Sequence, residues 1–262
     1  MYVELHAASA FSFLDGASLP EALIDRAAAL GYPALALLDR DGVYGAPRFH
    51  LAARRAGIKA IIGAELTIAI GTAASVVRLP VLVESQAGYR NLCRLVTRMK
   101  LRSPKGEGAL AIEELDGHVG GLIALAGRST LSGPRFGVGG LIDRIVYTFG
   151  AKNVCVELQR HLLRDEEADN QALVELASAF HVSVIATNGV RFAEPANRPL
   201  YDVVTCIRHK TTLERAGRRL TWNAERYLKS PDAMARLFSD MRRHPILSCR
   251  RDSGKRRLTS TA

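Results

Sequence analysis

Apolar runs alternate with amphipathic stretches along most of the chain. The apolar runs show no alternation with polar residues, which is typical of strands buried on both faces. The expected strands are residues 2–5, 34–38, 60–63, 66–70, 79–83, 122–126, 154–158 and 183–187. The expected helices are residues 18–31, 46–56, 87–99, 141–150 and 166–180. This order predicts a parallel sheet wrapped by helices and closed as an α/β barrel.

The first amphipathic stretch shows the signals of a helix most fully. Ser18 and Glu21 have the spacing of a capping box, Leu23 and Ala27 belong to one apolar stripe, and Gly31 stands where a helix would end. We therefore expect one continuous helix from Ser18 to Gly31, directly after the first loop.

The pattern changes near residue 195. Two amphipathic stretches, 198–217 and 223–240, predict helices without a further strand. The expected organisation is a barrel over residues 1–194, a helical segment over 195–240 packed outside it, and a basic tail over 241–262 that is either disordered or translated out of frame.

Composition adds limits rather than a function. The chain has 262 residues, 48% hydrophobic and 24% charged, as in an ordinary globular protein. No export signal is evident, and the longest apolar stretch, residues 66–77, is too short and too interrupted by glycine to cross a bilayer. We expect a cytoplasmic protein with no membrane contact. The four cysteines lack zinc-site spacing and are expected to be reduced thiols.

The formal charge of +10 is concentrated at the end of the chain. Residues 241–262 hold seven Lys and Arg against Asp252 alone, a net charge of +6. Such a tail could bind phosphates without specificity, but its lack of helical periodicity favours a solvated, disordered extension.

Polar residues follow the expected strands at their carboxyl ends, where a parallel barrel gathers its functional groups. They are His6, Asp39, Arg40, Glu65, Arg128, Glu157, His161, Asn188 and Arg191. Two kinds of site are compatible with them. Imidazoles and carboxylates could hold a divalent metal, whereas arginines cannot ligate a metal and instead favour phosphate or pair with the acids.

Six segments in order resemble the PHP (polymerase and histidinol phosphatase) domain that begins bacterial C-family replicative polymerase alpha subunits, above all the error-prone type used in damage-induced mutagenesis. They are "ELHAASAFSFLDGAS", "GYPALALLDRDGVYGAPRFHLAARRAGIKAIIGAEL", "GYRNLCRLVTRMK", "GLIALAGRS", "VELQRH" and "ATNGVRF". The resemblance implies a distorted (β/α)7 barrel of the PHP type with a C-terminal helical appendage. In intact members this barrel binds up to three metals and can hydrolyse phosphoesters.

The same resemblance implies that the metal cluster is degraded. Five of eight family ligand positions differ in this chain, and three of them are arginine. The vestigial metal set consists of His6, Asp15 and Glu65, which match family ligands, and of Asp39, which is kept beside the changed ligand position 40. The changed positions are Ala8, Arg40, Arg128, Gly189 and Arg191. Arg40, Arg128, Arg191 and His161 form a candidate anion-binding set.

The function implied is that of a non-catalytic scaffold in an error-prone DNA polymerase, active in DNA replication and DNA repair, which would contact DNA and the polymerase core. The alternative is a residual metal-dependent phosphoesterase or 3′–5′ exonuclease using Mn or Zn. The likeness stops near Asp240, and the palm that holds Mg in the family is not matched. We therefore expect a truncated or frameshifted product that alone neither polymerises DNA nor hydrolyses it, and needs no cofactor.

Overall fold

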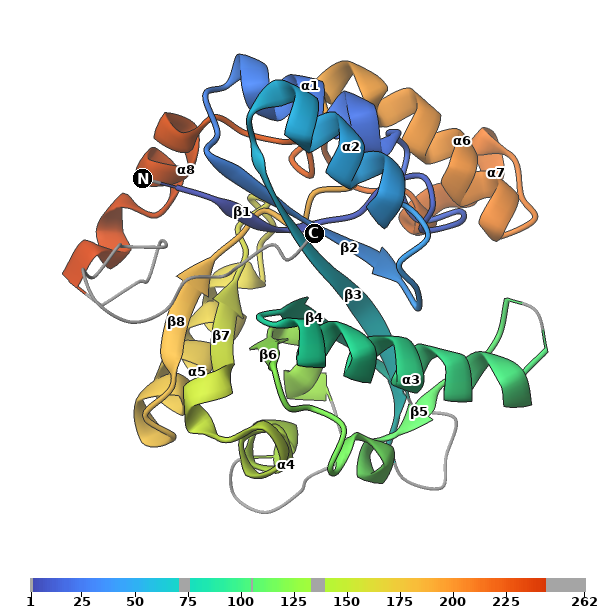
Figure 1. Ribbon diagram of the computed structural model, residues 1–262. Coiled ribbons are helices and arrows are strands. Elements are labelled where there is room, and N and C mark those ends of the chain that lie inside the picture. The colour runs from blue at the N-terminus through green and yellow to red at the C-terminus, as the bar shows by residue number, and fades with distance from the viewer. Residues whose placement is uncertain (1, 71–75, 105, 133–139, 244–262) are drawn as a thin grey trace.

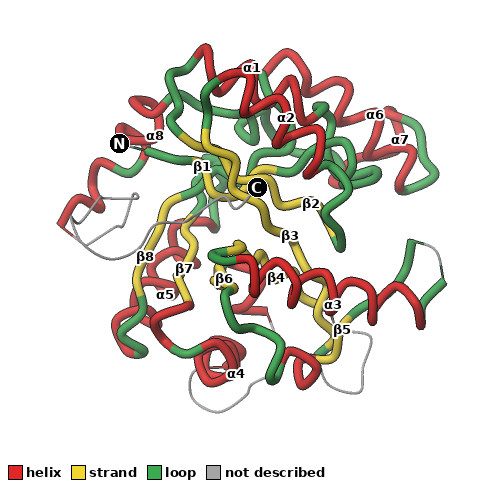
Figure 2. The backbone as a smooth tube through the Cα atoms, viewed as in Figure 1, coloured by secondary structure: helices red, strands yellow, loops and turns green. Residues whose placement is uncertain are grey.

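A computed structural model describes residues 2–70, 76–104, 106–132 and 140–243. Strands occupy its centre and helices surround them (Figures 1 and 2). The strands are β1 (Glu4–Ala7), β2 (Ala34–Arg40), β3 (Lys59–Ala69), β4 (Val76–Val83), β5 (Leu110–Ala111), β6 (Leu122–Ala126), β7 (Val154–Leu158) and β8 (Ser183–Ala186). The α-helices are α1 (Pro20–Ala29), α2 (Ala46–Ala56), α3 (Gln86–Arg102), α4 (Gly140–Phe149), α5 (Glu166–Ala179), α6 (Arg198–Arg208), α7 (Leu213–Ala216) and α8 (Pro231–Leu237).

The strands form one curled sheet in the order β1-β2-β3-β4-β6-β7-β8, with β5 added beside β3. This confirms the expected distorted α/β barrel. The expectation of a parallel sheet is wrong at one place, because β4 runs antiparallel to both β3 and β6. The two strands expected at 60–63 and 66–70 are one strand, β3. Ala64 and Glu65, between the two apolar runs, continue the pairing with β2 and β4.

The barrel is closed at its seam by residues that follow β8 rather than by β8 itself. Val190 forms a parallel bridge with Ala7. The Ala8 amide donates to the Val190 carbonyl at 2.9 Å, and the Val190 amide donates to the His6 carbonyl at 2.8 Å. His6 is thereby fixed at the junction between the first strand and the last.

The start of α1 differs from the capping box expected from the sequence. The helix begins at Pro20, which needs no amide partner at this position. Ser18 Oγ accepts from the Ala193 amide at 2.9 Å instead, and Glu21 pairs with Arg48. Contacts of Ser18 and Glu21 with residues distant in the sequence thus replace the local capping box. Gly31 does follow the helix with a positive φ of 69°, as expected.

The segment expected to be helical over 223–240 is helical only at α8 and in a short 3₁₀ turn after it. The residues before α8 are extended and enter the body of the protein. Tyr227 bridges Phe192, and both the Glu225 and Tyr227 carbonyls accept from Asn188 Nδ2 at 2.7 Å. The chain therefore returns to the barrel mouth before α8 begins.

Buried aliphatic side chains fill the space between the sheet and the surrounding helices. No helix in the described ranges is both long and apolar enough to cross a membrane. Cys93 and Cys206 are free thiols, while Cys249 and most of the basic tail, residues 244–262, lie outside the described residues.

Candidate functional site

His6 lies at the end of β1 between two buried carboxylates. Its Nδ1 is 2.7 Å from Oε1 of Glu157 on β7, and its Nε2 is 3.3 Å from Oε2 of Glu65 on β3. Burial alone would lower the pKa of His6, but the charge of Glu157 and the hydrogen bonds to both carboxylates raise it to about 10. At neutral pH the ring is therefore an imidazolium that donates from both nitrogens.

Glu65 faces a second cation from the opposite side of the mouth. Arg191, which follows β8, donates from Nη2 to the same Oε2 of Glu65 at 2.9 Å. Burial would raise the pKa of Glu65, yet the charges of Arg191 and His6 hold it well below its usual range. The pKa of Glu157 is likewise lowered, because the His6 charge and the hydrogen bonds from His6, Thr187 and Gln159 together outweigh the effect of burial. Both carboxylates are ionised and already engaged by cations.

Asp15 belongs to a neighbouring ion-pair cluster. Arg208 of α6 donates to its Oδ1 at 2.7 Å, while Arg191 Nη1 and Arg40 Nη1 lie 3.7 and 3.9 Å from its Oδ2. Asp15 and Arg40 do not line the pocket described below. Three guanidinium groups thus surround the carboxylate.

Asp39, at the end of β2, is also occupied. Its Oδ1 accepts from the Ser9 amide, the Ser9 hydroxyl and the Ser12 hydroxyl at 2.8 to 2.9 Å. The side chain is buried and lies outside the pocket lining. Its contacts are those of a residue that fixes the loop between β1 and α1.

His161 follows β7 and forms part of the wall. Its Nδ1 lies 2.8 Å from Glu166 Oε1, and its Nε2 lies 2.9 Å from the Asn188 carbonyl oxygen. Burial lowers the pKa of His161, and the bond to Glu166 opposes that effect. Since both ring nitrogens of His161 face acceptor oxygens of the protein, neither nitrogen is available to a ligand.

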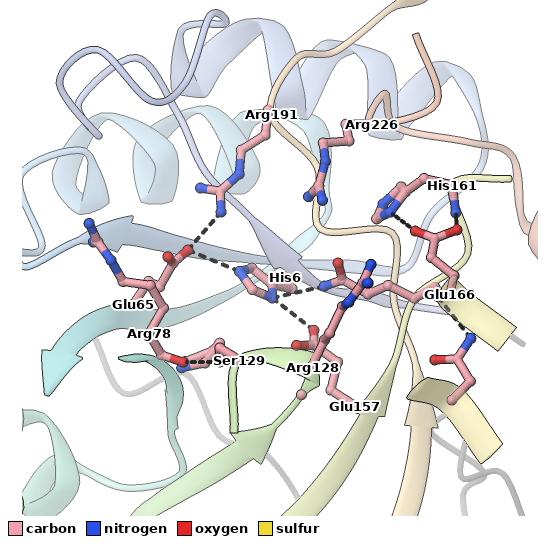
Figure 3. Close-up of a pocket in the computed structure, with 14 residues that line it drawn as sticks. His6, Glu65, Arg78, Arg128, Ser129, Glu157, His161, Glu166, Arg191 and Arg226 are labelled. Atoms are coloured by element: carbon pink, nitrogen blue, oxygen red, sulfur yellow. Dashed lines mark hydrogen bonds and ion pairs between the residues drawn. The ribbon is translucent and has the colours of Figure 1, made fainter. Parts of the chain in front are cut away.

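These side chains border a cavity of about 210 Å³ at the barrel mouth (Figure 3). Of the residues predicted from the sequence, it collects His6, Glu65, Arg128, Glu157, His161 and Arg191. It also collects Arg78 of β4 and Arg226, which the sequence reasoning missed. Arg78 is a charged residue among the apolar residues of β4, and this charge was a sequence signal for a polar site. Arg226 gave no such signal, because it lies in the stretch that was expected to be helical.

The possible metal donors of this mouth are paired with one another and with arginine. A ligating imidazole must present a lone pair, and both ring nitrogens of His6 face carboxylate oxygens. Across the described ranges, no group of three or more His, Cys, Asp or Glu residues is arranged to hold a metal ion. Arg191 and His6 supply the positive charge that the carboxylates of this mouth require.

The chain matches the family model described as "PHP domain" over residues 4–181. It is 40% identical over 248 residues to the error-prone DNA polymerase of Anaeromyxobacter sp., and 38% identical over 255 residues to that of Mycobacterium tuberculosis. Both alignments cover 91% of this chain but only 21% and 23% of the relatives. The chain therefore spans about a fifth of the length of these curated proteins.

Two solved structures share the fold at low identity. One is an amidohydrolase from Chromobacterium violaceum, with a TM-score of 0.54, 18% identity, and coverage of 73% of this chain and 88% of that one. The other is a putative metal-dependent phosphoesterase from Bifidobacterium adolescentis, with a TM-score of 0.50, 16% identity, and coverage of 71% and 86%. At these identities the likeness concerns the fold alone.

Proposed function

Because this chain belongs to the PHP domain family, we propose that it acts as the N-terminal PHP domain of an error-prone DNA polymerase of the alpha-subunit type, as a scaffold rather than a hydrolase. Error-prone polymerases of different bacteria are 39–40% identical to this chain over 91% of its length, which supports the first half of the proposal. The second half rests on the chemistry of the barrel mouth.

One observation carries the scaffold role: His6 and Arg191 meet on the same oxygen of Glu65. A divalent metal, when bound, would supply a Lewis acid and an activated water for phosphoester hydrolysis. Here its place beside Glu65 is taken by an imidazolium and a guanidinium. Neither cation can coordinate a water as a metal does, which supports a role other than hydrolysis.

The same ion pairs suit a structural role. They join β1, β3, β7 and the segment after β8, and so tie the rim of the barrel together without a metal. In the proposed setting the barrel supports a polymerase core that acts on DNA in the cytoplasm, during replication and the repair of damage. The core and the DNA are partners by this proposal only.

The alternative is a residual metal-dependent phosphoesterase or 3′–5′ exonuclease. It is favoured by the clustering of His6, Glu65 and Glu157, which would be donors if His6 lost one of its two ring protons. The two functions differ in whether added Mn or Zn can displace the cations from the carboxylates.

Metal analysis decides between them. The purified protein is dialysed against Mn or Zn, its metal content is measured by mass spectrometry, and hydrolysis of p-nitrophenyl phosphate and of a labelled single-stranded oligonucleotide is assayed. We expect metal well below one ion per chain and no hydrolysis above the EDTA-treated sample. Stoichiometric metal with a hydrolytic rate that is lost in Glu65→Gln would instead establish the phosphoesterase.

A further inference from the structure

Arg226 stands out among the cations of the mouth. In the described part of the chain, no carboxylate lies within 4.0 Å of its guanidinium, and its one side-chain hydrogen bond is a long contact of 3.5 Å to the Gly189 carbonyl. Burial and the nearby charge of Arg191 lower the pKa of Arg226. Arginine nevertheless remains charged in proteins, so Arg226 presents a positive charge with no carboxylate of the described residues in contact with it.

The carboxylates that line the cavity cannot serve as that counterion, because each is engaged elsewhere. Glu65 is held by His6 and Arg191, and Glu157 by His6 and by the Thr187 hydroxyl at 2.5 Å. Glu166 accepts from the His161 ring and from the backbone amides of residues 161 and 163. The cavity therefore has more positive charge than its acids neutralise.

The backbone places two of the arginines next to each other. The Arg191 amide donates to the Arg226 carbonyl at 2.9 Å, and both side chains enter the cavity from the same side (Figure 3). Two neighbouring guanidinium groups repel each other unless an anion lies between or below them. Guanidinium groups bind phosphate oxygens through paired N–H donors, which makes phosphate the natural ligand for such a pair.

Arg128 approaches from the opposite wall. It follows β6, its Nε is paired with Asp169, and its side chain points up into the cavity in Figure 3, while about half of it remains exposed. Its terminal nitrogens make no hydrogen bond with the described residues. Arg226 and Arg128 thus border the cavity from two sides and leave their donors available.

We propose that the barrel mouth binds a terminal phosphate group, held between Arg226 and Arg128 with Arg191 and Arg78 adding to the positive potential. The cavity, about 210 Å³, is below the range of about 300–1,000 Å³ typical of drug-sized ligands, which limits the occupant to a small group. Arg78 has only a distant partner, Asp41 at 3.9 Å, which already accepts from Thr67. A dianionic monoester or inorganic phosphate matches this excess of cations better than a singly charged diester.

This inference rests on the proposed function in one respect: the mouth must be free of a metal cluster. The test therefore uses EDTA-treated full-length chain whose metal content is measured first. Inorganic phosphate, phenyl phosphate and dimethyl phosphate are titrated at constant ionic strength against chloride, by calorimetry and by thermal unfolding.

Inorganic phosphate and phenyl phosphate are expected to bind and to raise the melting temperature, and dimethyl phosphate at least about tenfold more weakly. Arg226→Met and Arg128→Met should each lower the affinity for phosphate about tenfold or more, since each removes a charge-assisted hydrogen-bond donor. Arg218→Met, a change at an exposed arginine outside the cavity, should leave it unchanged. Melting of each variant without phosphate checks that it folds.

Two results would overturn the inference without touching the proposed scaffold role. One is metal-free protein that shows no response to phosphate beyond that to chloride. The other is an equal response in Arg226→Met and Arg218→Met, which would mark a general salt effect. Binding that appears only after stoichiometric metal is restored would overturn both proposals together.

Discussion

Arg191 donates from Nη2 to Oε2 of Glu65 at 2.9 Å, and so joins two residues that lie 126 positions apart. The Arg191 side chain is 12% exposed and that of Glu65 is 4% exposed. The pair is therefore largely removed from water, where loss of Arg191 leaves the Glu65 carboxylate with His6 as its remaining hydrogen-bonded cation.

Arg191→Met is expected to destabilise the protein by about 3–5 kcal/mol, because it leaves Glu65 buried beside His6 alone. Unfolding in urea, followed by far-ultraviolet circular dichroism, measures the loss. The double variant with Glu65→Gln should regain part of it, since the uncompensated charge is then gone.

Arg48→Met is the matched control. Arg48 also pairs with a glutamate, Glu21 at 2.6 Å, but the two side chains are 48% and 38% exposed. The expected cost is below about 1 kcal/mol. Equal costs for the two arginine variants would contradict a special role for the pair at the mouth.

The stability of the protein should fall as the pH rises from about 7 to about 10. His6 keeps its proton in the folded state up to a pKa of about 10, whereas the unfolded chain releases it near 6.5. Folded protein thus binds one proton more over this range, and the free energy of unfolding decreases by up to about 1.4 kcal/mol per pH unit from this group.

Glu157→Gln isolates the contribution of His6. Removal of the Glu157 charge lowers the pKa of His6, so the decrease in stability between about pH 7.5 and 9 should be shallower than in the unsubstituted protein. Urea titrations at the two pH values give both slopes. Parallel slopes would mean that His6 is neutral in the folded protein.

Asp39 is expected to be a structural residue. Asp39→Ala leaves the Ser9 amide and the hydroxyls of Ser9 and Ser12 without their acceptor, at a cost of about 3 kcal/mol or more. Asp39→Asn keeps one acceptor oxygen and should cost less. If Asp39 instead served a metal, Mn or Zn would raise the melting temperature of the unsubstituted protein, and the asparagine variant would lose that rise.

The sequence was sufficient to predict which residues at strand ends lie at the barrel mouth. His6, Glu65 and Arg128 each lie in or just after an apolar strand, and parallel strands bring such residues to one rim of a barrel. The direction of β4 was not predictable in this way, because apolar periodicity is the same in parallel and antiparallel strands. The charge of Arg78 beside apolar residues was visible in the sequence, but its position in the cavity did not follow from the pattern.

Contacts over long sequence separations explain the other differences. Arg226 reaches the mouth because Asn188 holds the carbonyls of Glu225 and Tyr227, which keeps an amphipathic stretch extended. The hydroxyls of Ser9 and Ser12 donate hydrogen bonds to Asp39 from a turn that the local sequence does not predict. In each case a partner on another element outweighed a local propensity.

Gly88 and Gly120 offer a test of packing between α3 and the start of β6. A methyl group at Gly88 would overlap the backbone carbonyl of Gly121, whereas one at Gly120 would meet only Asn91 Nδ2 at 3.7 Å. Gly88→Ala should therefore destabilise by about 1–3 kcal/mol or more. Gly120→Ala should change the urea midpoint little, and a comparable loss in both variants would contradict this packing.

The seam between Ala7 and Val190 has a consequence for biosynthesis. The outer edge of the first strand acquires its backbone partner only when residue 190 is available, and the Tyr32 hydroxyl finds its acceptor only at the carbonyl of Lys229, 197 residues later. The outer edge of β1 must therefore stay unpaired in a nascent chain until residue 190 has left the ribosome. Closure of the ring is a late event in the folding of this domain, and β1 is among the last of its elements to reach its final surroundings.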